Sequence, residues 1–185
     1  MPTAIALINR MFNADQAERQ RQPAIGSEEF DLLRRNEAQR REQLRGILTT
    51  REVNDPMALY RAALIMQHSD VLDDVRLAHE TAQRAADQDF PSARWLAAAS
   101  LDRWLMYQAK PQKYGTQIVS DGERQRLWHT DPATTDDERR ASGIASLAEL
   151  EAEAERVNLA EPVPSVAEAP DWLKAGLALW QSGAA

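Results

Sequence analysis

The segment from Met57 to Met66 most constrains the fold, because Arg61 is its single charged residue. A helix that is apolar nearly all round must be buried. Polar residues follow it directly in the run Gln67-His68-Ser69-Asp70. An unpaired polar group costs free energy when it is buried, so these side chains need partners. The pattern predicts either a functional site or a structural polar network beside a helical core.

Most of the chain shows helical signals. Thr3, Ser27 and Asp55-Pro56 are typical helix starts, since their side-chain oxygens can accept from the first free amides and Pro fits the first helical position. Asp70 is expected to cap a fourth helix. The apolar spacing predicts helices over residues 4–19, 28–48, 56–66, 71–86 and 93–109. The expected fold is mainly α: a helical bundle or short solenoid-like array of six to seven helices with one small β-hairpin.

The character of the chain changes after Pro111. Tyr114 to Val119 is partly alternating, Asp121-Gly122 reads as a two-residue turn, and Gln125 to His129 can pair back. These signals predict the β-hairpin, near residues 114–129.

A further helix is expected after the hairpin. Thr135 and Glu138 form a capping-box pattern, and the helix should run to about Val157, with Gly143 as a weak point inside it. The chain would then consist of a helical domain (1–157), an extended proline-containing linker (158–170) and a C-terminal helix (171–185).

One face of the C-terminal helix is apolar. It carries Trp172, Leu173, Leu177 and Trp180, and apolar patches of this kind usually mark an interface. We expect this helix to dock on its own domain, with a homodimer formed through it as the alternative.

Composition excludes several function classes. A net charge of −7 argues against nucleic-acid binding, and the mixed charges of residues 37–42 are typical of a solvated helix face. With no cysteines, disulfides and zinc–thiolate sites are excluded. No stretch is long and apolar enough to cross a membrane, the N-terminus is not a convincing signal peptide, and a cytoplasmic protein is expected. No metal or cofactor motif appears.

Asp102 and His68 are the candidate catalytic residues. Asp102 has Ala98, Ala99 and Met106 as helical neighbours, so its carboxylate should lie on a buried face. A His–Asp pair across two helices could orient the His68 imidazole as a general base, without a metal. The alternative is a satisfied structural pair that fixes the helix register.

The candidate substrate-binding residues are polar and cluster around these two positions. Arg103 could clamp an anion or pair with an acid, and the Tyr114–Gln117 loop could line a pocket or tie the hairpin to the helices. The full set is Gln67, Arg103, Gln112, Tyr114, Thr116 and Gln117.

The order of these polar motifs resembles an uncharacterised bacterial family, the domain of unknown function 6624. The resemblance rests on Gln67-His68-x-Asp70, Asp102-Arg103 and Tyr114-Gly115-Thr116-Gln117, with weaker echoes at Asp15, Arg19 and Asn36. It spans roughly residues 12–155 and implies a helical domain with these polar residues clustered. It implies no activity.

Two functions remain open from the sequence. The first is a domain that binds a small molecule or peptide in a polar pocket, with metal-free acid–base catalysis as an extension. The second is a structural or protein-interaction module, in which the polar cluster serves only the fold. A cavity lined by the polar residues would favour the first, and a sealed, mutually hydrogen-bonded network would favour the second.

Overall fold

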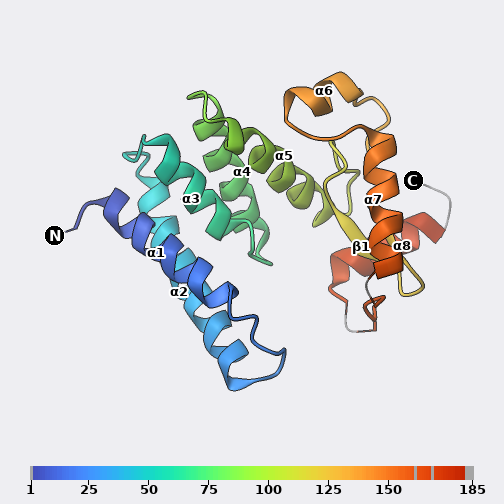
Figure 1. Cartoon of the computed structure of the whole chain (residues 1–185), viewed down its shortest axis with the longest axis horizontal. Helices are drawn as coiled ribbons and strands as arrows, with labels where there is room; N and C mark the ends of the chain where they lie inside the picture. The colour runs from blue at the N-terminus through green and yellow to red at the C-terminus, as the bar shows by residue number, and fades with distance from the viewer. Residues whose placement is uncertain (1, 161, 168, 182–185) are drawn as a thin grey trace. The chain divides into compact units, whose positions relative to one another are not determined.

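The computed structural model describes residues 2–160, 162–167 and 169–181, and divides the chain into two compact units, Met1–Ala97 and Ala98–Ala185 (Figure 1). Within the described residues the fold is mainly helical, with eight helices and a two-stranded antiparallel hairpin, which confirms the predicted class. The elements are α1 (Ala4–Arg19), α2 (Glu28–Thr49), α3 (Pro56–Met66), α4 (Leu72–Ala86), α5 (Pro91–Met106), β1 (Ile118–Ser120), β2 (Gln125–Leu127), α6 (Asp136–Ala141), α7 (Leu147–Ala160) and α8 (Asp171–Gln181). None of the helices in the described part combines the length and apolar character needed to cross a membrane.

The first three helices begin at the predicted caps. Thr3 Oγ1 accepts from the Ala6 amide at 3.2 Å, and Ser27 Oγ accepts from Phe30 at 3.1 Å. Asp55 Oδ1 accepts from the amide of the third helical residue at 2.7 Å, with Pro56 at the first position of α3. Local side-chain chemistry therefore sets where α1, α2 and α3 start.

The core of the first unit is built around α3, as its apolar sequence predicts. Leu59, Ile65 and Met66 are buried, and they belong to a cluster that includes Ile8 of α1 and Leu44 of α2. The one charged residue of α3 stays at the edge of this core: Arg61 Nη1 donates to Asn9 Oδ1 at 2.7 Å, and its guanidinium lies 5.3 Å from the centre of the Phe12 ring.

Asp70 does not cap α4, contrary to the prediction. The residue before the helix is Val71, which makes no side-chain cap. Instead, Ser69 Oγ accepts from the Val71 amide at 3.1 Å, and the Asp70 carboxylate points to Arg34. The Ser69 side chain lies on the buried side of this turn, where Ser69 is 1% exposed, whereas the Asp70 side chain is 69% exposed.

Helix α5 ends at Met106 and not at Ala109. Ala109 has a positive φ of 54°, and the Lys110 amide donates to Leu105 O at 3.0 Å, which closes the helix in a Schellman-type turn. Pro111 follows directly and cannot continue a helix.

The hairpin forms where expected, but it is shorter and has a wider turn. Ser120 pairs with Gln125, so the loop consists of four residues and not two. Asp121 Oδ1 accepts from the amides of Glu123 and Arg124 at 2.9 and 2.8 Å, and Gly122 has a φ of 94°. The side chain of Asp121 thus organises a four-residue turn. In Figure 1, α7 lies along this hairpin.

The single helix expected over residues 136–157 is two helices. The capping box of Thr135 and Glu138 is confirmed, but α6 ends at Ala141 and Gly143 adopts a φ of 73°. Ser146 then begins α7, with its amide donating to Glu149 Oε2 at 2.9 Å. Gly143 is therefore the end of a helix and not a weak point inside one. Helix α7 also continues to Ala160, three residues into the predicted linker.

Candidate functional site

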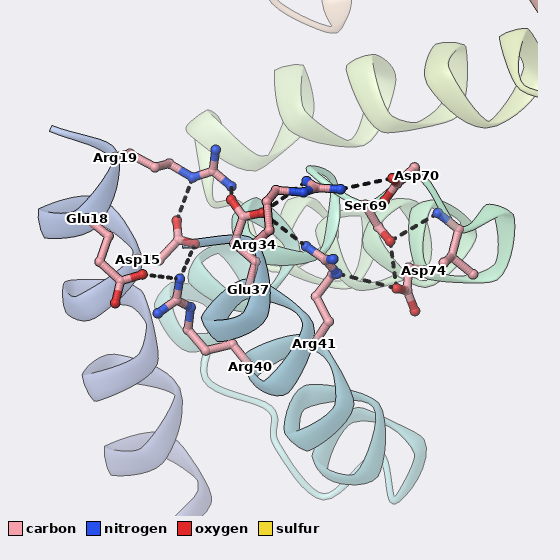
Figure 2. Close-up of polar contacts among 11 residues, drawn as sticks. Asp15, Glu18, Arg19, Arg34, Glu37, Arg40, Arg41, Ser69, Asp70 and Asp74 are labelled. Carbon is pink, nitrogen blue, oxygen red and sulfur yellow. Dashed lines mark hydrogen bonds and ion pairs between the residues drawn. The ribbon is translucent and has the colours of Figure 1, made fainter. Parts of the chain in front are cut away.

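A network of charged side chains occupies the first unit, where the sequence predicted a solvated helix face. Glu37, Arg40 and Arg41 of α2 are 2%, 7% and 6% exposed, so that prediction was wrong. Their partners come from α1 and from the chain around the start of α4 (Figure 2). We refer to the following residues as the ion-pair network: Asp15, Glu18, Arg19, Arg34, Glu37, Arg40, Arg41, Arg45, Ser69, Asp70 and Asp74.

Glu37 lies at the centre of the ion-pair network. Arg19 Nη2 donates to its Oε1 at 2.6 Å, and Arg34 Nη1 donates to its Oε2 at 3.1 Å. The Arg41 guanidinium lies 3.8 Å from the same Oε2. A buried carboxylate is tolerable here because three guanidinium groups surround it.

The α1 side of the network is held by Asp15 and Glu18. Asp15 is fully buried; its Oδ2 accepts from Arg19 Nε at 3.0 Å and its Oδ1 lies 3.4 Å from Arg40 Nη2. Arg40 Nη2 also donates to Glu18 Oε2 at 2.7 Å. Burial acts to raise the pKa of Glu18, but the hydrogen bond and charge of Arg40 outweigh it, so this pKa lies below its ordinary value. The Glu18 carboxylate is therefore held in its charged form by α2.

The other side of the network ties down the turn that follows α3. Ser69 Oγ donates to Asp74 Oδ2 at 2.7 Å, while Arg45 Nη1 donates to Asp74 Oδ1 at 3.0 Å. Gln67 and His68 precede Ser69 on this turn; Gln67 is buried and His68 is half-buried. The network thus fixes the backbone that carries the Gln-His-x-Asp motif.

Four members of the network are more than a quarter exposed: Arg45, whose side chain is 38% exposed, and Arg19, Arg34 and Asp70, which form one edge of the network. The side chains of Arg19, Arg34 and Asp70 are 29%, 41% and 69% exposed. Arg34 Nη2 donates to Asp70 Oδ2 at 2.9 Å. Both arginines also donate to buried Glu37, which holds their guanidinium groups in place.

The second unit encloses the predicted residue Asp102 in a loop of backbone donors. Asp102 is fully buried, as its apolar neighbours predicted. Its Oδ1 accepts from the amides of Lys113 and Tyr114 at 2.8 and 2.9 Å. Its Oδ2 accepts from the amides of Gly115 and Thr116 at 3.0 Å each, and from Thr116 Oγ1 at 2.8 Å. We call this arrangement the Asp102 cradle.

Gly115 makes the cradle possible. It has a positive φ of 98°, and a Cβ atom at this position would lie 3.0 Å from Leu150 Cδ1. Only glycine adopts this backbone freely, so it allows four successive amides to turn toward one carboxylate. Burial raises the pKa of Asp102 above its ordinary value, and the amides of Tyr114 and Thr116 oppose this rise.

The two predicted glutamines hold the ends of the cradle to the hairpin and to α5. Gln112 Nε2 donates to Trp128 O at 2.8 Å, and its Oε1 accepts from the Gln117 amide at 2.8 Å. Gln117 Nε2 donates to Ala99 O at 3.2 Å, and its Oε1 accepts from Arg103 Nε at 3.1 Å. The structure therefore brings the predicted residues of the second unit together as partners of one another.

Arg139 is part of this arrangement and was missed by the sequence reasoning. It is 2% exposed, and its Nε donates to Tyr114 O at 2.9 Å. Its Nη1 donates to Thr134 O at 2.9 Å and lies 3.0 Å from Asp136 Oδ1. The sequence feature that could have drawn attention to Arg139 was its position inside the capped helix α6, four residues after Thr135.

The predicted His68–Asp102 pair joins residues of different units. His68 lies on the turn after α3 in the first unit, and Asp102 lies in α5 within the second. The pair and its catalytic role stay a prediction. Both Asp102 oxygens already accept hydrogen bonds from residues 113–116 of its own unit.

The charged network could have been found from helical spacing. Asp15 and Arg19 are four residues apart, Arg34 and Glu37 three, and Glu37 and Arg41 four. Such pairs share a helix face, but the spacing does not show that a second helix covers that face. Across the described residues, no group of three or more histidine or acidic side chains is arranged to hold a metal ion.

Comparison with known proteins adds no relative to this picture. No family model matches the chain, and searches of curated proteins and of solved structures each return no match. The resemblance to the domain of unknown function 6624 therefore remains an expectation from the sequence.

Proposed function

We propose that the chain is a helical binding domain that holds an acidic small molecule or peptide at the Arg19–Arg34 edge of the ion-pair network. The observation that carries this proposal is the shared anchoring of both arginines on buried Glu37, at 2.6 and 3.1 Å, while their side chains remain 29% and 41% exposed. A guanidinium recognises carboxylate and phosphate groups through paired N–H donors. Orienting it in advance lowers the entropy cost of binding.

Asp70 supports the proposal because it occupies the position that a ligand carboxylate would take. Its side chain is 69% exposed and accepts from Arg34 Nη2 at 2.9 Å. An exposed ion pair of this kind contributes only about 0.2–1 kcal/mol. An incoming carboxylate can therefore replace Asp70 at low cost.

Calorimetric titration with tri-glutamate tests the proposal. Arg34→Gln should weaken binding by about tenfold or more, because a hydrogen bond to a charged group contributes about 1.5–3 kcal/mol. Asp70→Asn should strengthen binding, by up to about fivefold, because it removes the internal competitor.

Arg94→Gln is the matched control. Arg94 forms another exposed pair of the first unit, with Asp89 at 3.4 Å, and neither residue belongs to the network. It should leave the affinity for tri-glutamate unchanged. Equal binding by the parent, Arg34→Gln and Arg94→Gln proteins, or no binding by any of them, would contradict the proposal.

The second candidate is that the polar residues of the second unit serve the fold alone. The five hydrogen bonds received by Asp102 within its own unit favour this structural role. Under this candidate, Gln117→Ala lowers stability but leaves tri-glutamate binding unchanged. Acid–base catalysis by His68 and a cytoplasmic location complete the proposal as expectations.

A further inference from the structure

The C-terminal helix α8 covers an apolar face of the second unit. This face is formed by Met106 of α5, Val119 of β1 and Trp128, and Leu173 of α8 packs against it. The Trp172 ring centre lies 4.8 Å from that of Tyr107 and 6.0 Å from that of Trp128. We call the surface of Met106, Tyr107, Val119 and Trp128 the Trp128 seat. The helix therefore docks within its own unit, as preferred from the sequence, while the side chain of Trp180 lies outside the described residues.

Gly176 makes the contact between α8 and the Trp128 seat specific. A Cβ atom at this position would lie 1.9 Å from Cη2 of Trp128, well inside any real contact distance. The backbone of α8 therefore rests directly on the indole ring. Trp172 and Gly176 are four residues apart on one face of α8, and together with Leu173 they contact the seat. A helix with any larger residue at this position would have to lift off the ring.

The described residues of the linker that connects α7 to α8, 162–167 and 169–170, make few contacts. Ser120 Oγ donates to Pro164 O at 2.6 Å, and the Val166 side chain lies against Gly122. Pro162, Val163, Pro164 and Ser165 are exposed. The segment from residue 161 to residue 170 contains three prolines, and an extended chain of that length reaches about 30 Å. The linker is thus long enough to follow more than one path. Because most of its described residues are exposed, their packing does little to fix that path.

We propose that α8 is an exchangeable docking helix, which seats on the Trp128 seat of a second copy of this chain as well as on its own. The occupant follows from the observed contact, because every copy carries both the seat and the matching residues Trp172, Leu173 and Gly176 of α8. An exchanged dimer keeps all contacts between α8 and the seat, and only the linker changes its course. A short tether gives the intramolecular contact an effective concentration in the millimolar range. The monomer is therefore favoured in dilute solution. A tether that is too short to bring α8 to its own seat removes this advantage and favours the dimer.

Sedimentation of the full chain and of a variant that lacks residues 163–167 tests the inference. The shortened linker removes the Pro164 and Val166 contacts and halves the reach of the tether. We expect the variant to be mainly dimeric at about 10 µM, with a dimer dissociation constant at least tenfold below that of the parent. Adding Gly176→Leu to the shortened chain should return it to a monomer, because α8 then fits no seat.

Two controls keep the inference open to refutation. Gly46 is a helical glycine of the first unit, and a Cβ atom added there would have no atom within 4 Å. Gly46→Ala in the shortened chain should therefore leave the dimer intact. The unaltered chain, at about 1 mM, should itself contain dimers that dissociate on dilution. A shortened chain that stays monomeric, a dimer that survives Gly176→Leu, or an unaltered chain that stays monomeric at this concentration would overturn the inference.

Discussion

The two units bury negative charge in different ways. In the first unit, Glu37 and Asp15 are each surrounded by arginine side chains from their own helix and from the other of the two helices α1 and α2. In the second, Asp102 is surrounded by four consecutive backbone amides and one hydroxyl from a single loop. The first arrangement joins helices through flexible charged side chains, whereas the second fixes the shape of one loop.

This difference has energetic consequences. An arginine loses conformational freedom when it is held in an ion pair, and at an exposed edge salt screens the attraction. Backbone amides have no rotamers to lose, and those of the Asp102 cradle lie 2.8–3.0 Å from the carboxylate. We therefore expect the cradle to be the more rigid and the network the more sensitive to its surroundings.

Removing the carboxylate of the cradle should have the largest effect on stability. Asp102→Ala leaves four amides and the Thr116 hydroxyl without an acceptor inside the protein, and we expect unfolding to become easier by about 3–5 kcal/mol. Urea denaturation measures this change, and amide exchange at Lys113–Thr116 should speed up with it. Asp137→Ala, at a carboxylate that is 87% exposed, is the control and should change stability by less than about 0.5 kcal/mol. Equal stability of the two variants would show that the cradle contributes little to the fold.

Neutralising the centre of the network should have a smaller effect that depends on salt. Glu37→Gln leaves Arg19 and Arg34 without their shared counter-charge, and we expect a loss of about 2 kcal/mol in dilute buffer. The loss should shrink in 1 M NaCl, because the partners of Glu37 are partly exposed and salt screens them.

Glu42→Ala provides the comparison on the same helix. The side chain of Glu42 is 77% exposed and pairs with Arg45 at 3.1 Å. This variant should change stability by less than about 1 kcal/mol at any salt concentration. A Glu37→Gln effect that is independent of salt would make the network resemble the cradle and remove the distinction between the two units.

The sequence was informative wherever the deciding chemistry is local. Caps such as Thr3, Ser27 and Asp55 act within one helical turn, and they were read correctly. The burial of Asp102 followed from its helical neighbours. The failures arose where the partner is distant: residues 37–42 looked solvated because nothing in their spacing shows that α1 covers them.

The donors of the cradle illustrate a second limit. Tyr114, Thr116 and Gln117 were selected for their side chains, but Asp102 is held mainly by the amides of this loop. Every residue other than proline has an amide, so side-chain identity does not reveal where amides converge. Gly115, with its positive φ, was the most useful local sign of an unusual backbone.

The smallest effect that we expect is a dependence of stability on pH, carried by His129 in the second unit. Burial lowers the pKa of His129 below its ordinary value, and the nearby charge of Arg126 lowers it further. The unfolded chain then takes up a proton at higher pH than the folded protein, so stability is present above about pH 6.5 and is lost as the pH falls below it. The melting temperature of the parent should therefore drop between pH 7.5 and pH 5.5 by more than that of His129→Gln. An identical drop in the parent and His129→Gln would assign the acid sensitivity to groups other than His129. The first unit would then be the more responsive of the two units to solution conditions.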